Sequence, residues 1–365
     1  MRGIVVEEPG GPALVVDDLE VEEPRGGEVL VKIEHCALCH SDVTVQNSAT
    51  AGHPVALGHE AAGRVEALGS GVSGISVGDP VVLAVAPACG LCAFSVRGEA
   101  SLCVQTSVVL RGVFPDGSSR LTRQGELVRR GVGLGAFAER IVVSRSAVVV
   151  VDPDTPLHLA CVLGCGVGTG LGAVLNTAAV KPGGSMFVAG LGGVGMAAVL
   201  GGVVAGAARI IVSDPVAERR ELALELGATS ALDPNTDDIV AKTIELNGRG
   251  VDDAFEMTGR PEILSSLIQV VRPGGAVTLV GVPEQMATAY TIDRAALFIM
   301  TEKTLRGCVY GSSNAHRDIP LYLDLWKAGR LDLESLVTAR RPLEEIDTAL
   351  DDLHAGRGVR TVLDI

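Results

Sequence analysis

Cysteine and histidine side chains occur in three separated segments that could together hold a metal ion. The segments are "HCALCHSD" (35–42), "GHEAAG" (58–63) and "LGCGVGTGLG" (163–172). One cysteine or histidine from each segment would give three protein ligands and leave one tetrahedral position open, an arrangement typical of catalytic zinc. Spacing alone selects no particular three residues among the eight cysteines and seven histidines.

A fourth segment, "ACGLCAFSVRGEASLC" (88–103), places Cys89, Cys92 and Cys103 in most of a four-thiolate pattern. Ser95 stands where the remaining cysteine of a C-x-x-C-x-x-C-x7-C run would complete a tetrahedral zinc site. Because a hydroxyl binds zinc less well than a thiolate, ligand softness favours a degenerate lobe without metal. Completion by water or by another side chain is the alternative. Cys89 and Cys92 are also expected to be close enough to form a disulfide under oxidation.

A glycine-rich loop follows an apolar strand and precedes an apolar helix in "MFVAGLGGVG" (186–195). Gly190, Gly192 and Gly195 form the pattern G-x-G-x-x-G. The first glycine permits a tight turn, the second lets the backbone approach a pyrophosphate, and the third lets the helix pack on the strand. We therefore predict that this loop, including Gly193 and Val194, holds dinucleotide phosphates at the positive end of the helix.

An acidic residue ends the next apolar segment, "IIVSD", at Asp214, nineteen residues beyond Gly195. A carboxylate at this place accepts hydrogen bonds from the adenosine ribose and repels a 2′-phosphate, so NAD is predicted in preference to NADP. The alternative is that the glycines serve only a turn and that Asp214 caps the following helix. Arg219 is expected to stack beside the adenine or to be solvated, and it would weaken the NAD preference slightly.

The strands and helices that must position these groups are predicted from two kinds of sequence pattern. Up to about residue 160, valine-rich segments separated by Gly, Pro and Asp predict a mostly β region, with strands in "EVLVKIEH", "AAGRVEALG", "DPVVLAVA" and "AERIVV". From about 167 to 307, apolar strands alternate with helical segments, which predicts a doubly wound parallel sheet of the Rossmann type. The tail, ending in "RTVLDI", is expected to return to the first domain. The expected domains are 1–166 with 310–365, and 167–309.

Length and charge limit the function classes. A chain of 365 residues exceeds the size of a single growing core, so two domains are expected. The formal charge of −14, from 44 acidic and 30 basic residues, would repel a phosphate backbone or an anionic membrane, so no nucleic-acid partner is expected. Two C-x-x-C pairs in an enzyme-sized chain indicate thiol chemistry in a reducing compartment, and the cytoplasm is predicted.

The N-terminal stretch and one apolar run bear on the question of a membrane. "MRGIVVEEPGGPALVV" lacks the basic leader and cleavage site of a signal peptide and is predicted to form a strand. The run 193–212 is long enough to span a bilayer. Because it begins inside the glycine fingerprint and breaks at Ala207 to Arg209, we predict a buried helix and a buried strand, with no membrane partner.

These motifs together resemble the zinc-dependent medium-chain alcohol dehydrogenases over essentially the whole chain. "LCHSD", "GHEAAGRV", "GDPVV", "CGVGTGLGA", "GLGGVG" and the terminal "VRTVL" stand in that family's order. The resemblance implies a mostly β, GroES-like catalytic domain beside the Rossmann domain. It also implies one catalytic zinc per chain on Cys39, His59 and Cys165, the Cys2His set known for alcohol dehydrogenases, with Asp42 and Glu60 orienting the ligands.

The resemblance also implies a reaction path. Zinc would lower the pKa of a bound alcohol so that an alkoxide forms near neutral pH and gives hydride to the nicotinamide. Ser41 would take the proton, and Thr44 stands where many relatives have a histidine that completes the relay. His40 and Arg360 are expected near the cofactor pyrophosphate. Further cofactor contacts implied by the resemblance are Thr169 and the Tyr310 backbone at the nicotinamide.

Two more features follow from the family pattern. Cys89, Cys92 and Cys103 match three of the four thiolates that hold a second zinc in relatives. Residues 104–134 resemble the long-loop branch, which includes the class III, glutathione-dependent formaldehyde dehydrogenases. The stretch between Cys39 and His59 lacks the acidic residues which that branch uses for the glutathione adduct. Homodimers paired through "TLRGCVYG" (304–311) are expected by analogy with the long form.

The substrate prediction depends on small residues at positions that often carry bulky rings. Val85, Gly131 and Val132 stand at these positions, and only 3% of the chain is aromatic. We therefore expect a wide apolar pocket for a medium-to-large primary alcohol, aliphatic, aryl or terpenoid, or its aldehyde. The alternatives are a zinc-containing reductase of an enal C=C bond, a thiol-adduct formaldehyde dehydrogenase, and a nucleotide-binding protein without turnover.

Overall fold

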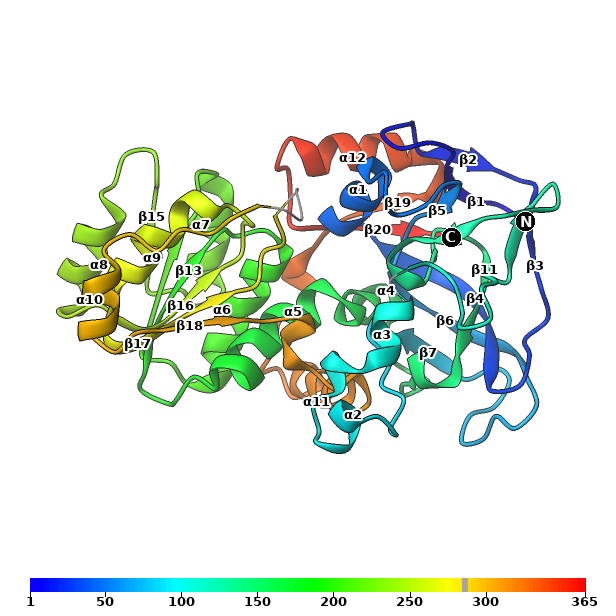
Figure 1. Cartoon of the computed structure of the whole chain (residues 1–365), viewed down its shortest axis with the longest axis horizontal. Coiled ribbons are helices and arrows are strands. Elements are labelled where there is room, and N and C mark those ends of the chain that lie inside the picture. Colours follow the sequence, from blue (N-terminus) through cyan, green and yellow to red (C-terminus); the bar gives the residue numbers. More distant parts are fainter. Residues whose placement is uncertain (110, 284–287) are drawn as a thin grey trace. The chain divides into compact units, whose positions relative to one another are not determined.

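A computed structural model of the chain describes residues 1–109, 111–283 and 288–365, with the backbone alone for 107–109. The chain divides into two compact units (Figure 1). Unit 1 contains Met1–Gly166, Ser313–Lys327 and Leu333–Ile365, and unit 2 contains Val167–Ser312 and Ala328–Asp332. Residues 310–312 and 328–332 thus cluster with unit 2, whereas the sequence analysis places the whole tail from 310 in the first domain.

Unit 1 is built on a seven-stranded sheet in the order β12-β7-β6-β4-β20-β19, with β11 also paired to β4. Its strands are β4 (Glu28–Ala37), β6 (Glu60–Leu68), β7 (Pro80–Leu83), β11 (Arg140–Ser144), β12 (Val148–Val150), β19 (Val337–Pro342) and β20 (Arg360–Asp364). The pairing of β20 with β4 joins the last strand of the chain to the main sheet of unit 1. Antiparallel pairing of β4 and β6 sets Ala37 opposite Glu60, so the end of one strand meets the start of the other.

Two smaller sheets and short helices complete unit 1. One sheet has the order β10-β5-β1-β2, with β1 (Gly3–Val6), β2 (Leu14–Val16), β5 (Val55–Ala56) and β10 (Arg129–Arg130), and the other joins β3 (Leu19–Val21), β8 (Leu121–Arg123) and β9 (Glu126–Leu127). The helices are α1 (His40–Asn47), α2 (Ala93–Val96), α3 (Val104–Val109), α4 (Leu157–Ala160), α11 (Ala315–Lys327) and α12 (Ile346–His354). The single-turn segments η1 (Ala100–Leu102), η2 (Gly131–Gly133) and η4 (Cys161–Gly164) lie between them.

Unit 2 is a six-stranded sheet in the order β15-β14-β13-β16-β17-β18, and every pairing in it is parallel. Its strands are β13 (Ser185–Ala189), β14 (Arg209–Ser213), β15 (Ser230–Leu232), β16 (Val251–Glu256), β17 (Val271–Leu279) and β18 (Thr304–Gly307). This order reverses direction between β13 and β16, which is where doubly wound sheets bind nucleotides at the carboxyl ends of their strands.

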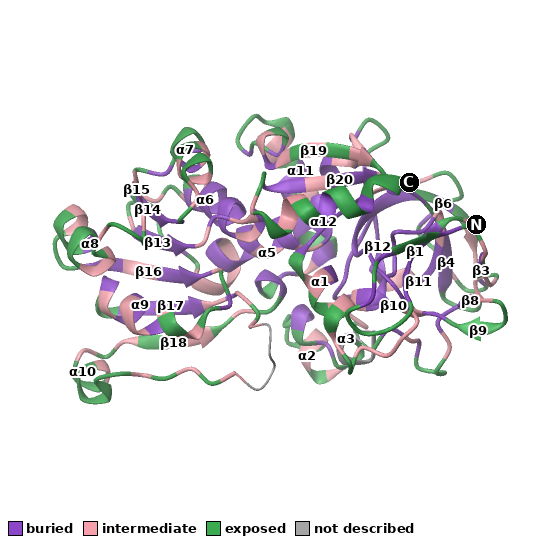
Figure 2. Cartoon of the chain, turned by 90° about the horizontal axis from the view of Figure 1, so that it is seen from above, coloured by how far each residue is buried: buried purple, intermediate pink, exposed green. Residues whose placement is uncertain are grey.

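Helices and one π-helical segment surround that sheet. They are α5 (Gly166–Gly172), η5 (Ala173–Ala178), α6 (Gly193–Ala205), α7 (Ala217–Glu225), α8 (Ile239–Asn247), α9 (Leu264–Val270) and α10 (Ala295–Met300). All five residues of β13 are buried, as expected for a central parallel strand. Figure 2 shows β13 as buried, β16 as mostly buried and α10 as largely exposed. Short β15 and α8 were not predicted from the sequence.

The apolar run at 193–212 is divided between α6 and β14, because Gly206 adopts a left-handed conformation (φ 74°) and ends the helix. Within the described ranges, no single helix is long and apolar enough to cross a bilayer. One bent pair of apolar segments, Leu157–Gly164 with Gly166–Ala178, has the length and composition of a membrane span, and no other feature supports that interpretation.

Candidate active site

Donor atoms from three distant segments of unit 1 converge. Ligand atoms of Cys39, His59, Glu60 and Cys165 all lie within 4.8 Å of one another. Cys39 directly follows β4 and precedes α1, while His59 and Glu60 begin β6. The β4–β6 pairing therefore joins the first two segments, and the turn after η4 delivers Cys165. The cluster contains the three residues assigned to zinc by resemblance.

Asp42 orients this cluster from the first turn of α1. Its fully buried carboxylate accepts from His59 Nδ1 at 2.9 Å, from the Gly58 amide at 2.9 Å and from the Cys39 amide at 3.1 Å. A proton on Nδ1 leaves the lone pair of His59 Nε2 free, and that buried nitrogen has no hydrogen-bond partner among the described residues. Because buried polar atoms are nearly always paired, the orphan nitrogen fits a metal ligand.

The ionisation of the cluster supports the same conclusion. A hydrogen bond from Cys165 is the main reason that the pKa of Cys39 is well below its usual range, while the pKa of Cys165 is well above it. Burial raises the pKa of Glu60 to about 8, although Arg360 opposes the shift. Three acidic groups this close cannot all ionise without a compensating charge, and a divalent cation removes that conflict.

Arg360 lies beside this cluster in unit 1. Its guanidinium is 3% exposed and stands 3.4 Å from a Glu60 oxygen, which also accepts from the Gly166 amide at 2.9 Å. A Cβ at Gly166 would come within 1.7 Å of the guanidinium, so a larger residue there would displace Arg360 from this position. The glycine of "CGVG" is the sequence signal for this close approach, and it was not used above. The contact of Arg360 with pyrophosphate stays a prediction.

Helix α1 carries the residues assigned to the proton relay. Ser41 Oγ lies 3.9 Å from the sulfur of Cys39. The Thr44 hydroxyl donates to the carbonyl of His40 at 3.2 Å, so its proton is held by the helix while its lone pairs can still accept. His40 and Thr44 are both exposed.

Two of the three predicted substrate positions lie near this helix. The segment η2 packs against α1 and contains Gly131 and Val132. Val132 has φ 48° and ψ 31°, a left-handed conformation that is strained for a β-branched side chain. Such strain is commonly kept at ligand-binding segments. Val85 is buried, two residues beyond β7.

The glycine loop of unit 2 has the geometry that the fingerprint requires. Gly190 has φ 90°, and a Cβ at Gly195 would lie 1.8 Å from the Gly190 carbonyl oxygen. A Cβ at Gly192 would meet no atom within 4 Å, so the backbone there faces open space that a ligand can enter. Helix α6 begins at Gly193 without a side-chain cap, which leaves its first amides for phosphate oxygens. Val194 is in the same first turn.

Asp214, which directly follows β14, forms a hydrogen bond with that loop. Its buried carboxylate accepts from the Leu191 amide at 2.7 Å and from the Val216 amide at 2.9 Å. Each oxygen keeps a lone pair for a ribose hydroxyl. Arg220, which the sequence analysis did not consider, donates to the Asp214 carbonyl at 2.6 Å and pairs with Asp233 at 3.2 Å. Arg219 precedes it on α7 and is half-buried.

The segment assigned to the nicotinamide is conformationally unusual. Tyr310, Gly311 and Ser312 are consecutive left-handed residues with φ 54°, 65° and 48°. A Cβ at Gly311 would lie 2.8 Å from the Thr169 carbonyl, so the segment packs directly on α5. Thr177, another residue missed from the sequence, holds the Ser312 hydroxyl at 2.8 Å.

A buried carboxylate also lies at the switch point. Glu256 ends β16 in register with Ala189, which directly precedes the glycine loop. One of its oxygens accepts from the Thr258 amide and hydroxyl, both at 2.6 Å, and from the Gly259 amide at 2.9 Å. Burial raises the pKa of Glu256. An acid closing an apolar strand was the available sequence signal.

Two further features lie apart from these residues. Cys89, Cys92 and Cys103 also gather within 4.8 Å as free thiols.

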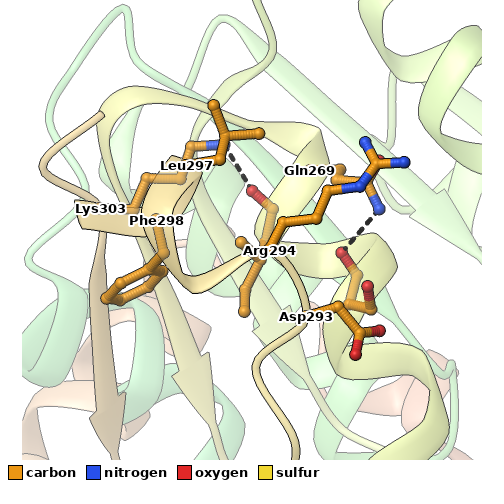
Figure 3. A pocket seen from close by; sticks show the side chains of 8 residues that line it. Gln269, Asp293, Arg294, Leu297, Phe298 and Lys303 are labelled. Carbon is orange, nitrogen blue, oxygen red and sulfur yellow. Dashed lines mark hydrogen bonds between the residues drawn. The ribbon is translucent and has the colours of Figure 1, made fainter. Parts of the chain in front are cut away.

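A small pocket in unit 2 involves α9, α10 and Lys303, whose ammonium donates to the Ile268 carbonyl (Figure 3). It is lined by Ser265, Ile268, Gln269, Asp293, Arg294, Leu297, Phe298 and Lys303. None of these lining residues belongs to the predicted site.

Comparison with known proteins agrees with this geometry. Residues 25–153 match the alcohol dehydrogenase GroES-like domain, and residues 193–328 match the zinc-binding dehydrogenase family. An NDMA-dependent alcohol dehydrogenase of Amycolatopsis methanolica is 38% identical over 99% of this chain and 98% of its own length. The chain belongs to the zinc-binding alcohol dehydrogenase family. This alcohol dehydrogenase is therefore an oxidoreductase, and the alternative of a nucleotide-binding protein without turnover is set aside.

Other relatives of this alcohol dehydrogenase differ in their named substrates. An S-(hydroxymethyl)glutathione dehydrogenase of Synechocystis is 36% identical over 99% of both chains. The crystal structure of benzyl alcohol dehydrogenase from Acinetobacter calcoaceticus has a TM-score of 0.94 at 32% identity, covering 100% of this chain and 99% of that one. Both domains of the alcohol dehydrogenase fold are thus present, as predicted, and the cofactors are those of the family, zinc and NAD. The homodimer and the cytoplasmic location stay predictions.

Proposed function

We propose that this alcohol dehydrogenase interconverts a medium-to-large primary alcohol and its aldehyde with NAD, using zinc held by Cys39, His59 and Cys165. The observation that carries the proposal is the buried cluster of two sulfurs and an imidazole whose Nε2 has no partner among the described residues. Three ligands of this kind leave a fourth position for the substrate oxygen. Glu60 reaches the same cluster but also pairs with Arg360.

The chain's own residues prepare this site in separable ways. When bound, zinc acts as a Lewis acid that polarises the substrate oxygen. Asp42 holds His59 in the tautomer that leaves Nε2 free, and it also fixes the Cys39 amide. The Ser41 hydroxyl is proposed to receive the alcohol proton, and its position beside the Cys39 sulfur supports this role. The Thr44 hydroxyl donates its proton to the His40 carbonyl, so it can only accept a further hydrogen bond. The proposed relay from Ser41 to solvent therefore includes water.

The nucleotide unit supports NAD as the redox partner. Its glycine loop offers open backbone at Gly192, and Asp214 places a carboxylate beside it. A 2′-phosphate would meet this buried negative charge, whereas ribose hydroxyls can donate to it. Thr169 and the Tyr310 backbone are proposed to contact the nicotinamide.

Pocket composition supports a bulky substrate. Val85, Gly131 and Val132 are small side chains at positions where bulky rings are common, and this composition is the support for a wide pocket. The similarity to a benzyl alcohol dehydrogenase over the whole chain supports an aryl alcohol within this class. Initial rates with ethanol, octanol, benzyl alcohol and geraniol, each with NAD and NADP, test the proposal. It fails if ethanol gives the highest kcat/KM.

A second candidate substrate is the glutathione adduct of formaldehyde, because relatives at 36% and 34% identity are named S-(hydroxymethyl)glutathione dehydrogenases. The same panel should therefore include formaldehyde with glutathione. Rates that need glutathione and exceed those with benzyl alcohol would select this candidate. Rates unaffected by glutathione would select the free alcohols.

A further inference from the structure

Residues 308–312 form a tight turn directly after β18, at the carboxyl edge of the parallel sheet of unit 2. The Ser312 amide closes the turn by donating to the Val309 carbonyl at 3.0 Å. Doubly wound sheets bind dinucleotides at this edge. With the adenosine half beside Asp214 at β14, as proposed above, the other half extends from the glycine loop towards β16, β17 and β18. The turn therefore belongs to the nicotinamide side of the sheet.

The turn keeps an unfavourable backbone conformation. Tyr310, Gly311 and Ser312 are consecutive left-handed residues, and only glycine adopts this region without a steric penalty. Gly311 packs on α5, since a Cβ there would lie 2.8 Å from the Gly172 Cα and 2.9 Å from the Gly168 carbonyl oxygen. Tyr310 and Ser312 lack the freedom of glycine, so contacts from outside the turn must hold them in place.

One side-chain hydroxyl joins both ends of this turn. Thr177 Oγ1 donates to the Cys308 sulfur at 3.2 Å and lies 2.8 Å from the Ser312 hydroxyl. Because a threonine hydroxyl has one proton, its lone pairs are left to accept from Ser312. Burial raises the pKa of the Cys308 thiol, and hydrogen bonds from Thr177 and from the backbone of Gly311 and Ser312 oppose that shift. The preceding residue, Asn176, donates to the Gly311 carbonyl at 3.4 Å.

The backbone of Thr177 is fixed by an unusual local structure. It lies in the π-helical segment η5, a rare type of helix that occurs frequently at functional sites. Arg306 on β18 donates to the Thr177 carbonyl at 3.1 Å and pairs with Asp253 at 2.9 Å. The edge strand therefore holds the backbone of Thr177, while the side chain of Thr177 holds the turn that follows this strand.

We propose that Thr177 is a positioning residue for the nicotinamide: its hydroxyl keeps the turn 308–312 in the conformation that presents the Tyr310 backbone to the cofactor. The inference rests on the proposed function, in which Thr169 and the Tyr310 backbone contact the nicotinamide. The Thr169 carbonyl oxygen is 2.8 Å from the Cβ position of Gly311, so both contacts belong to one surface of unit 2. Thr177 acts through the turn and not by touching the cofactor.

Binding of NADH and of ADP-ribose separates the two halves of the cofactor. ADP-ribose shares the adenosine and the pyrophosphate with NADH but lacks the nicotinamide, so only NADH reports on the turn. Thr177→Val keeps the shape of the side chain and removes its hydroxyl. The Kd for NADH should rise about three- to tenfold in this variant, as expected for the loss of one hydrogen-bonding group. The Kd for ADP-ribose should be unchanged. Titration calorimetry of the purified full-length protein measures both.

Further variants separate this role from a general effect on folding. Thr177→Ser keeps the hydroxyl and should restore NADH binding. Ser312→Ala removes one partner and leaves the contact with Cys308, so its NADH-specific loss should be smaller than in Thr177→Val. Because Ser312 is exposed, this variant provides the same comparison if Thr177→Val fails to fold. Thr243→Val is the matched control, since its buried hydroxyl donates to the Ile239 carbonyl at 2.7 Å within α8, outside the turn and η5. It should change neither Kd.

The possible results distinguish this inference from the proposed function. Equal weakening of NADH and ADP-ribose binding in Thr177→Val would show that the hydroxyl supports the nucleotide unit as a whole, which overturns the inference. Unchanged NADH binding in Thr177→Val, in a protein that binds NADH more tightly than ADP-ribose, would remove Thr177 alone and leave the proposed function standing. Equal Kd values for the two ligands in the natural protein would contradict the proposed nicotinamide contact, and the inference would fail with it.

Discussion

Replacing Asp42 should weaken both zinc binding and the fold, by amounts that its contacts allow to be separated. Its carboxylate accepts from His59 Nδ1 and from the amides of Gly58 and Cys39. Loss of a group that orients a ligating histidine typically lowers metal affinity tenfold to a hundredfold, which is about 1.4 to 2.7 kcal/mol. In Asp42→Ala, two buried amides also lose their acceptor, at about 1 to 3 kcal/mol each.

Asp42→Asn divides these effects. An amide oxygen can still accept from His59 and Gly58, but the amide nitrogen then faces the Cys39 N–H and cannot accept from it. The metal-free protein should therefore lose about 1 to 3 kcal/mol of unfolding free energy in Asp42→Asn and about 2 to 6 kcal/mol in Asp42→Ala. Zinc affinity should fall in both variants, and more in Asp42→Ala.

The assay is zinc competition with a chromogenic chelator, combined with denaturant unfolding of the metal-free protein. Asp252→Asn is the matched control, because Asp252 accepts from the Ser185 amide at 2.8 Å in unit 2 and touches no proposed zinc ligand. It should change stability without changing zinc affinity. If Asp42→Ala bound zinc as tightly as the natural protein, the assignment of His59 Nε2 as a ligand would be wrong.

Three further predictions concern stability and cofactor choice. Arg120→Met should destabilise unit 1 by about 3 to 5 kcal/mol, measured by denaturant unfolding, because it leaves the buried Glu28 carboxylate without its partner at 2.7 Å; a loss below 1 kcal/mol would contradict this. The raised pKa of Glu256 means that the folded state binds its proton more tightly than the unfolded chain, so stability declines as pH rises above the ordinary value of 4.5. Glu256→Gln should therefore raise the melting temperature more at pH 8 than at pH 5, and an equal rise at both would oppose the reasoning. Asp214→Ser should raise kcat/KM with NADP relative to NAD by roughly tenfold, as steady-state rates can show, and an unchanged ratio would remove Asp214 from cofactor selection.

Much of the framework follows from local pattern. Valine-rich segments and alternating strands and helices predicted β4, β6, β13, α6 and β14, because buried parallel strands and helix periodicity leave a strong signal. The glycine fingerprint was equally readable, since its three glycines answer local needs of turn, approach and packing. Short β15 and α8 were missed because few residues provide too weak a pattern.

The sequence by itself determined which residue types were available for chemistry: cysteines and histidines in three segments, a glycine loop, and an acid after the second strand of unit 2. Only the tertiary structure decided which of these residues lie next to one another. Antiparallel pairing of β4 with β6 brings Cys39 to His59, and β20 delivers Arg360 to Glu60 beside Gly166. The same folding turned the Ser95 hydroxyl towards the sulfurs of Cys89 and Cys92. Such contacts depend on strand register and on side chains far apart in the chain, which local periodicity does not encode.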